Sequence, residues 1–331
     1  LGQGTIATSH PLFLGMGGMH GSFAANIAMT EADFMISIGC RFDDRLTGNP
    51  KTFAKNAKVA HIDIDPAEIG KIISADIPVV GDAKKALQML LAEPTVHNNT
   101  EKWIEKVTKD KNRVRSYDKK ERVVQPQAVI ERIGELTNGD AIVVTDVGQH
   151  QMWAAQFIDF SNPRTWLNSG GAGTMGYAIP AALGAKAAAP EKEIWVVDGD
   201  GCFQMTNQEL TTAAIEGFPI KVALINNGNL GMVRQWQTLF YDGHYSHTKL
   251  REQHEYIPAF VKLAEAQGCV AFRVTKDEEI EPAIRKAQEI TDRPVVIDFI
   301  VGQAAQVWPM VAAGHSNSDV EYARRLRPLF D

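Results

Sequence analysis

Residues 194–203 read IWVVDGDGCF, an apolar run that ends in acidic residues and glycines. Such a run, followed by turn-forming residues, predicts a buried strand. A second apolar run, residues 221–225, ends in the polar turn NNGN at 226–229. Because ligands of open parallel sheets bind beyond the carboxyl ends of strands, we expect the two turns to build one site.

The two turns offer the ligands of a hard cation. A carboxylate, a side-chain carbonyl and a backbone carbonyl make an oxygen-rich site of the kind that Mg²⁺ prefers, completed by phosphates and water. Gly199 and Gly201 let the backbone approach a diphosphate closely. Each turn alone is typical of an ordinary loop, so the prediction depends on the pair, with a helix and a strand between them.

Short apolar strands alternate with helices along the chain, which predicts α/β architecture with parallel sheets. We expect strands at residues 34–39, 59–64, 141–146, 194–197, 221–225, 270–274 and 295–301. We expect helices at residues 23–29, 83–91, 152–157, 173–188, 207–216, 257–267 and 278–289. The helix at 173–188 is apolar nearly all round, which predicts burial. The pattern indicates two doubly wound domains, at residues 1–92 and 126–331.

Composition excludes several classes of protein. The 331 residues are 44% hydrophobic and 22% charged, which argues against disorder. Lys and Arg number 34 against 40 Asp and Glu, and the net charge of −6 disfavours nucleic acid or an anionic membrane as a partner. No apolar run reaches the roughly 18 residues of a membrane span. Cys40, Cys202 and Cys269 are too few and too dispersed for a disulfide framework, and they fit a reducing compartment.

The segment at 93–125 differs from both flanks. Residues 101–122 are dominated by charges of both signs, with Trp103 and Tyr117 as the aromatic residues, so we expect a solvated helical linker. The chain starts at Leu1 in a glycine-rich stretch and shows no signal peptide. We expect it to be the C-terminal part of a longer protein.

Five motifs carry a resemblance to a known family. In the second half they are DVGQHQMW at 146–153, GTMGYAIPAA at 173–182 and GMVRQWQ at 231–237. In the first half they are GMHG at 18–21 and RFDDRLTG at 41–48. Together with the paired turns, which follow the pattern of thiamine diphosphate (TPP) enzymes, they closely resemble the large subunit of acetohydroxyacid synthase (acetolactate synthase). The resemblance extends from about residue 10 to WPMV at 308–311.

The resemblance implies a TPP and Mg²⁺ site in the second half of the chain. Asp200 and Asn227 would supply side-chain oxygens to Mg²⁺, and Asn229 its backbone carbonyl. Gln149 and His150 would contact the diphosphate, because free N–H groups at the start of a helix suit an anion. The expected TPP positions are Gly148, Gln149, His150, Gly173, Met175, Gly199, Asp200, Gly201, Cys202, Asn227, Asn229, Gly231 and Met232.

The resemblance also implies a substrate end of this site. Met175 and Met232 would pack around the rings of TPP, and Met232 would hold the cofactor in its bent form, a task that suits a soft side chain. Trp236 matches the tryptophan that favours the larger second 2-ketoacid, and Val233 lies on the same edge. The expected substrate-binding residues are therefore Met232, Val233 and Trp236.

The first half resembles the FAD-binding middle domain of the family. Arginine suits the flavin diphosphate because its fork bonds bidentately, and acidic residues at strand ends can accept from ribose hydroxyls. The positions that match the ribityl and diphosphate segments are Gly18, Met19, His20, Gly21, Arg41, Asp43 and Arg45. Those that match the adenosine end are Asp63, Ile64 and Asp82.

The activity implied by the resemblance is decarboxylation of pyruvate and its condensation with a second 2-ketoacid. Pyruvate or 2-ketobutyrate would give 2-acetolactate or 2-aceto-2-hydroxybutyrate, in the synthesis of valine, leucine and isoleucine. A homodimer or dimer of dimers, a small regulatory subunit and a cytoplasmic location (a plastid in a plant) follow from the family. The glutamate that activates TPP belongs to the family's pyrimidine-binding domain, so no catalytic residue is expected in this chain, which alone would be inactive.

Two alternatives stay open at this point. The intact protein could be another TPP and FAD enzyme, such as glyoxylate carboligase, sulfoacetaldehyde acetyltransferase or pyruvate oxidase. The chain could also be an inactive cofactor-binding fragment. Position 202 is Cys where relatives often carry Ser, a departure that leaves the expected metal oxygens in place.

Overall fold

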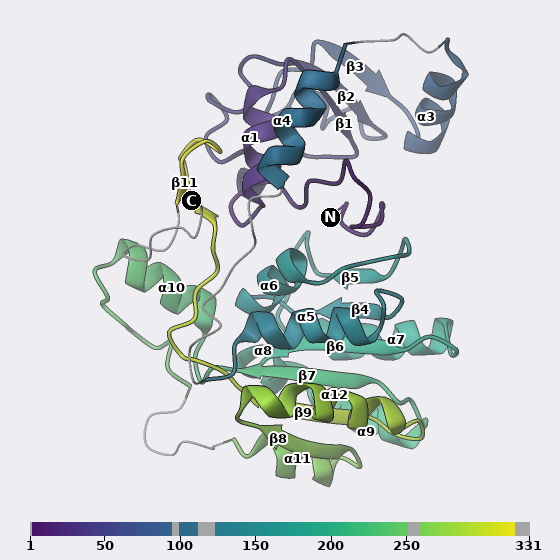
Figure 1. The fold of residues 1–331 in the computed structure, drawn as a ribbon, viewed down its shortest axis with the longest axis vertical. Coiled ribbons are helices and arrows are strands. Elements are labelled where there is room, and N and C mark those ends of the chain that lie inside the picture. Colours follow the sequence, from purple (N-terminus) through teal and green to yellow (C-terminus); the bar gives the residue numbers. More distant parts are fainter. Residues whose placement is uncertain (1, 95–98, 112–122, 251–257, 322–331) are drawn as a thin grey trace. The chain divides into compact units, whose positions relative to one another are not determined.

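The structure is a computed structural model that describes residues 2–94, 99–111, 123–250 and 258–321. The chain divides into two compact units (Figure 1). One comprises Leu1–Phe13 and Arg115–Val307, and the other Leu14–Val114 and Trp308–Asp331. We call them the six-stranded unit and the three-stranded unit after their main sheets. Among the described helices, none is both long and apolar enough to cross a membrane.

The six-stranded unit is built on a parallel sheet with the order β5-β4-β6-β7-β9-β8. Its strands are β4 (Ile142–Thr145), β5 (Trp166–Asn168), β6 (Ile194–Gly199), β7 (Lys221–Asn226), β8 (Val270–Val274) and β9 (Val295–Ile300). The chain leaves β4 for β5 on one side and returns to β6 on the other, so the strand order reverses between β4 and β6. This confirms the doubly wound parallel sheet and marks its switch point, where such sheets bind ligands.

Helices cover both faces of this sheet, because successive strand residues point to opposite sides. Trp195 and Val197 belong to the core that α5, α6 and α12 cover, and Ile194 and Val196 to the core under α7, α9 and α11. The helices are α5 (Pro126–Leu136), α6 (Gln149–Phe157), α7 (Ala178–Ala188), α8 (Asp200–Thr206), α9 (Glu209–Ile215), α10 (Gly231–Phe240), α11 (Phe260–Ala266), α12 (Ile280–Glu289) and the 3₁₀ turn η1 (Asp277–Glu279).

The helix predicted at 173–188 begins later, at Ala178. Gly173 and Gly176 have positive φ angles of 66° and 91°, which a right-handed helix does not allow. The carboxylate of Asp146 accepts the N–H groups of Gly176 and Ala178, both at 2.9 Å. The end of a neighbouring strand therefore determines where α7 starts.

The prediction that this helix is buried all round is also wrong. Ala178, Ile179 and Ala182 are buried, whereas Pro180 and Gly184 are exposed. Small residues raise the mean hydropathy of a helix but expose little apolar area, so α7 can turn one face to solvent. The other predicted helices and strands lie within three residues of the observed bounds. Residue 257 of the helix predicted at 257–267 lies outside the described residues.

The three-stranded unit contains a parallel sheet with the order β1-β2-β3. Its strands follow one another in chain order, so the described part of this unit has no reversal of strand order. A small antiparallel pair, β10 with β11, also belongs to it. Its elements are α1 (Phe23–Glu31), β1 (Phe34–Ile38), α2 (Asp44–Thr47), β2 (Lys58–Asp63), β3 (Ile77–Val80), α3 (Ala83–Ala92), α4 (Glu101–Lys111), β10 (Met310–Val311) and β11 (Val320–Glu321).

The segment expected to be a linker, 93–125, contains the packed helix α4. Val107 and Asp110 are buried, and Lys106 lies 2.6 Å from Glu31 on α1 and 3.3 Å from Asp110. The segment therefore has packing of its own on the three-stranded unit. Tyr117 and the rest of 112–122 lie outside the described residues.

The ends of the chain belong to other units than the expected domains, 1–92 and 126–331, imply. Residues 2–13 join the six-stranded unit, where Gln3 donates to the Ala155 carbonyl at 2.9 Å and the Thr8 N–H to the Phe160 carbonyl at 3.0 Å. Residues 308–321 join the three-stranded unit, where the Val311 N–H donates to Met19 at 2.8 Å. Hydrogen bonds to backbone carbonyls of residues distant in sequence support these memberships.

Candidate functional site

A cavity lies at the carboxyl ends of β4, β6 and β7, next to the switch point of the six-stranded sheet. Most of its lining comes from the segments that follow these strands and from the start of α10; Met175 comes from the segment before α7, and Ile225 lies on β7 itself. The lining residues are Val147, Gly148, Gln149, His150, Trp153, Met175, Gly199, Asp200, Gly201, Cys202, Ile225, Asn227, Asn229, Leu230, Gly231, Met232 and Val233. All but two of the expected TPP and substrate positions are therefore brought together; Gly173 and Trp236 are not part of this lining.

The two polar turns meet at this cavity, as their positions after neighbouring strands predict. The Asp200 carboxylate accepts the Gly228 N–H at 2.6 Å and the Gly201 N–H at 3.0 Å. Asn227 Oδ1 accepts the Asn229 N–H at 2.9 Å, which closes the turn. Asp200, Asn227 and Asn229 are all buried. The three expected metal ligands therefore belong to one hydrogen-bonded unit.

The start of α6 faces the cavity, and no side chain among the described residues caps its first backbone N–H groups. Its N-cap residue, Gly148, has φ 144° and provides no side-chain cap. Gln149 and His150, at the first two helical positions, line the cavity. The Nε2 atom of His150 is buried and has no hydrogen-bond partner among the described residues. Burial lowers the pKa of His150 to about 4, although the charge of Asp146 acts to raise this pKa. The ring is therefore neutral at pH 7.

These residues fit a Mg²⁺ diphosphate. The carboxylate, amide and backbone oxygens of the two turns form the all-oxygen set that Mg²⁺ favours. The uncapped N–H groups of α6 and the unpartnered His150 Nε2 offer donors to phosphate oxygens. A Cβ at Gly199 would lie 2.7 Å from the His150 ring and one at Gly201 2.8 Å from Leu230, so a side chain at either position would displace a residue that lines the cavity.

Two buried aspartates that the sequence reasoning did not assign support the site. Asp146 accepts the Gly176 N–H, as described above. The Asp198 carboxylate lies within 4.8 Å of a ring nitrogen of His150 and of Cys202 Sγ. Burial is the main cause that raises the pKa of Asp198 well above its ordinary value, and the charge of Asp146 is the second. Burial, and next Asp198, also raise the pKa of Cys202. Asp198 is the first polar residue after an apolar run, and Asp146 is the first residue after β4, a signal that could have found them.

The residues expected at the substrate end divide into two groups. Met232 and Val233 line the cavity together with Met175. Trp236 lies one turn further along α10, half-buried, with its ring centroid 5.2 Å from that of Phe240. The Trp236 ring therefore packs along its own helix, while Met232 and Val233, one turn earlier on α10, line the cavity.

In the three-stranded unit, the predicted flavin positions of the first motif pack against those of the second. The Met19 N–H donates to the Arg45 carbonyl at 2.7 Å. Gly18 has φ 96°, and a Cβ there would collide with the same carbonyl, so only glycine fits. Gly21 would likewise collide with the Met16 carbonyl. Burial, and next Arg45, lower the pKa of His20 to about 4.

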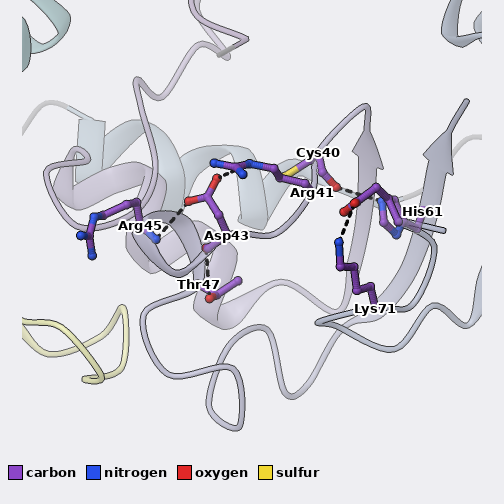
Figure 2. Close-up of polar contacts among 8 residues, drawn as sticks. Cys40, Arg41, Asp43, Arg45, Thr47, His61 and Lys71 are labelled. Carbon is purple, nitrogen blue, oxygen red and sulfur yellow. Dashed lines mark hydrogen bonds and ion pairs between the residues drawn. The ribbon is translucent and has the colours of Figure 1, made fainter. Parts of the chain in front are cut away.

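The charged residues of the second motif form a local network that Figure 2 shows. Asp43 is the N-cap of α2: its carboxylate accepts the Arg45 N–H at 3.0 Å and lies 3.3 Å from Arg41 Nε. The Arg45 guanidinium turns to Asp44 instead, at 3.0 Å, and is largely exposed. Both guanidinium groups are accessible to an anionic ligand.

The positions expected at the adenosine end lie where β2 and β3 end. The Gly81 N–H donates to the Asp63 carbonyl at 2.9 Å, which places Asp82 beside the end of β2. Asp82 is the N-cap of α3 and accepts the Lys85 N–H at 3.0 Å. Ile64 is 72% exposed, and a Cβ at Gly81 would meet no atom within 4 Å, so this edge of the sheet is open.

Comparison with known proteins gives two matches to family models. Residues 146–299 match the C-terminal TPP-binding domain of thiamine pyrophosphate enzymes, and residues 1–90 match their central domain. The first match contains every cavity residue described above. The chain belongs to the thiamine pyrophosphate enzyme family.

Within this family of thiamine pyrophosphate enzymes, the chain is similar to acetolactate synthases. It is 63% identical to the acetolactate synthase large subunit of Corynebacterium glutamicum, over 99% of this chain and 53% of that protein. It is 56% identical to the acetolactate synthase of Mycobacterium leprae, over 100% of this chain and 54% of that protein. It is 43% identical to the isozyme 3 large subunit of Escherichia coli, over 95% of this chain and 56% of that protein. The chain thus spans about half the length of these relatives.

Proposed function

We propose that the chain provides the diphosphate-binding and Mg²⁺-binding half of an acetolactate synthase active site. The intact enzyme would join pyruvate to a second 2-ketoacid with loss of CO₂, giving 2-acetolactate from pyruvate or 2-aceto-2-hydroxybutyrate from 2-ketobutyrate. Bound TPP supplies the electron sink that this decarboxylation needs. The similarity to acetolactate synthases supports this member of the family over the other carboligases and oxidases.

One observation carries the proposal: Asp200 and the 227–229 turn are hydrogen-bonded to each other beside an uncapped helix start, at the switch point of the sheet. Asp200, Asn227 and the Asn229 carbonyl would hold Mg²⁺. The N–H groups at Gln149 and His150 would bind the diphosphate oxygens. Since these groups are buried and already oriented, little conformational entropy is lost when they bind the charged group.

The apolar part of the cavity would exclude water from the reacting groups. Met175, Ile225, Leu230 and Met232 all line it. A cavity closed to water strengthens the electrostatic interactions within it and protects reactive carbon centres from protonation. On α10, Val233 and Trp236 would contact the second 2-ketoacid, with Trp236 setting the preference for 2-ketobutyrate.

We assign FAD to the three-stranded unit, beside the carboxyl ends of its parallel strands. The exposed guanidinium groups of Arg41 and Arg45 would bind the flavin diphosphate, and Asp63 and Asp82 the adenosine end. Ile64 would contact the adenine through its exposed side chain. Open space around Gly81 supports this placement.

The assembly and location that we propose follow the relatives. A homodimer or dimer of dimers would complete each site, and a small regulatory subunit would bind it, as the term large subunit in the names of two relatives suggests. The cysteines at 40, 202 and 269 are free thiols, which supports a reducing cytoplasm. The relatives named above are bacterial and give the plastid alternative no support.

The test is product formation from pyruvate plus 2-ketobutyrate with TPP, Mg²⁺ and FAD. The chain would be assayed alone and joined behind the N-terminal portion of the C. glutamicum relative, with that complete relative as positive control. We expect acetohydroxyacids only from the joined protein, because the activating glutamate lies in that portion. Turnover by the chain alone would contradict the half-site assignment, and a different product would point to another carboligase of the family.

Asp200→Ala in the joined protein tests the metal site itself. We expect Mg²⁺-dependent TPP binding to weaken at least 100-fold, because the diphosphate would lose a charged oxygen ligand of its cation, a larger loss than that of a neighbouring supporting group. Quenching of tryptophan fluorescence by TPP measures the binding, since Trp153 lines the cavity. The matched control is Asp292→Ala, an exposed aspartate of the same unit paired with Arg293. Equal affinity in the two variants would mean that the site is misplaced.

A further inference from the structure

Helix α10 carries a buried glutamine one turn beyond its cavity-lining residues, which are Gly231, Met232 and Val233. Gln235 is 1% exposed, whereas its neighbours Arg234 and Trp236 are half-buried. Burying an amide without hydrogen bonds costs several kcal/mol in an apolar medium, so such a group is paired in a stable fold. What Gln235 pairs with therefore shows what holds this face of the helix.

Gln235 binds the backbone of a segment distant in sequence. Its Oε1 accepts the Val307 N–H at 2.9 Å, and its Nε2 donates to the Val307 carbonyl at 3.1 Å. One side-chain amide thus engages both backbone groups of Val307, which fixes which end of the amide is oxygen. Next to it, Arg234 Nη1 donates to the Gln303 carbonyl at 2.9 Å and holds the same segment, residues 303–307.

The orientation of Gln235 determines that of Gln149. Gln235 Oε1 also accepts Gln149 Nε2 at 2.8 Å, and the Ala305 carbonyl accepts the same nitrogen at 3.1 Å. Both partners are acceptors, so the NH₂ end of Gln149 must face them. Its oxygen then faces the opposite side, toward the 227–229 turn, which we call the metal turn.

The orientation of Gln149 in turn determines that of a metal ligand. Gln149 Oε1 accepts Asn227 Nδ2 at 3.2 Å, so the nitrogen of Asn227 is held there and its Oδ1 is directed into the 227–229 turn. An asparagine can present either end of its amide, and only the oxygen can ligate a cation. The hydrogen bonds to Val307 therefore fix the amide of Gln235, which fixes that of Gln149, which in turn fixes that of Asn227.

We infer that Gln235 is a positioning residue for the metal site: through Gln149 it holds Asn227 Oδ1 toward the cation and couples α10 and the 303–307 segment to Mg²⁺ affinity. The inference rests on the proposed function, because that function makes Asn227 a Mg²⁺ ligand. Residues that orient a ligand typically contribute 10–100-fold to metal affinity. The Mg²⁺ dependence of cofactor binding is therefore the property to measure.

The test compares Gln235→Met with Gln288→Met in the joined protein. Methionine keeps the length of the side chain and removes the amide. Gln288 on α12 is also hydrogen-bonded, to the Leu136 carbonyl at 3.4 Å and Glu193 Oε2 at 3.4 Å, next to the amino end of β6 and therefore at the opposite end of the strands from the 227–229 turn. We expect the Mg²⁺ concentration for half-saturating TPP binding to rise at least tenfold in Gln235→Met and to stay at the wild-type value in Gln288→Met. Equal values in both variants would overturn the inference.

A double-variant cycle separates positioning from general loosening. If Gln235 acts through Gln149, the two substitutions share one effect. The double variant Gln149→Met, Gln235→Met then raises the Mg²⁺ concentration for half-saturating TPP binding no more than Gln149→Met alone. Effects that multiply would mean that the two residues act independently, which contradicts the inference.

Hydrogen exchange of the chain without ligands gives a readout that needs no cofactor. In Gln235→Met we expect faster amide exchange at 303–308 and also at 227–232, with β8 unchanged as the folded reference. Faster exchange at 303–308 alone would show that Gln235 only anchors that segment, and would overturn the inference. If wild-type protein binds no TPP, the proposed function fails, while this measurement still decides the coupling.

Discussion

The two units place predicted ligand positions at the same point, the carboxyl ends of parallel strands, but they hold them differently. In the six-stranded unit every residue of β7 is buried, whereas in the three-stranded unit β1 exposes Phe34, Ile36 and Ile38. Parallel sheets are normally covered on both faces, and one face of β1 is not covered by the described residues. The polar cavity residues Asp200 and Asn227 of the first unit are accordingly buried and hydrogen-bonded, while Arg45 and Ile64 of the second are largely exposed.

The difference shows where orientation comes from. A buried polar group must be paired, so Asp200, Gln149 and Gln235 have partners that fix their geometry before any ligand binds. Exposed groups such as Arg41 and Arg45 can choose water or a neighbouring carboxylate, and a ligand must order them at an entropic cost. We therefore expect substitutions of charged groups to have larger effects in the six-stranded unit.

The largest effect on stability is expected from Asp298→Ala. Asp298 is fully buried on β9 and accepts Arg273 Nη2 at 2.8 Å and Asn226 Nδ2 at 2.7 Å. Removing one partner of a buried ion pair leaves the other uncompensated, which typically costs about 3–5 kcal/mol of unfolding free energy. Urea unfolding of the chain measures it. The exposed pair tested by Asp292→Ala should change the unfolding midpoint undetectably, and similar losses in both variants would break the comparison.

A smaller effect is expected from His20, a buried titratable group of the three-stranded unit whose pKa is lowered. Its folded pKa of about 4 lies below the ordinary 6.5, so the unfolded chain binds the proton first. The stability contributed by neutral His20 is present above about pH 6.5 and is lost as the pH falls toward 4. By linkage the loss is about 2–3 kcal/mol at pH 4.5.

His20→Gln should remove that part of the acid destabilisation. The measurement is urea unfolding at pH 7.0, 5.5 and 4.5 for wild type and variant, with the exposed His315→Gln as control. As the pH falls, the unfolding free energy of wild type should decrease more than that of His20→Gln. An equal pH dependence of the unfolding free energy in the two proteins would contradict this prediction. It would mean that His20 is accessible to water, as the exposed side chains of β1 are.

The smallest effect is expected at Asp82, where a structural role and a proposed ligand role coincide. Asp82→Ala removes the N-cap of α3 and should cost about 1 kcal/mol of unfolding free energy. Asp82→Ser keeps a capping oxygen and should restore that stability, but its shorter neutral side chain should still weaken FAD binding if the carboxylate binds ribose. Flavin fluorescence on titration measures the binding. Full recovery of FAD affinity in Asp82→Ser would leave Asp82 only its capping role.

Much of the architecture followed from local pattern. The apolar runs at β6, β7 and β9 predicted buried strands, and polar residues directly after β6 and β7 predicted where the metal turn would form. Weak signals were missed: β3 has only four residues and contains Pro78, which an edge strand tolerates, and β5 has three. The start of α7 was misplaced because the carboxylate of Asp146, on another element, determines it.

The sequence by itself determined which residues occupy the strand ends, because the alternation of apolar and polar residues is a property of the local chain. It could not determine which distant groups meet. Gln149 and Gln235 are 86 positions apart, and Asp298 and Asn226 are 72 apart, yet each pair shares a hydrogen bond. Those pairings depend on strand order and register, which arise only when the sheet assembles. The tertiary structure alone therefore decided how the oxygens of Asp200 and Asn227 are held.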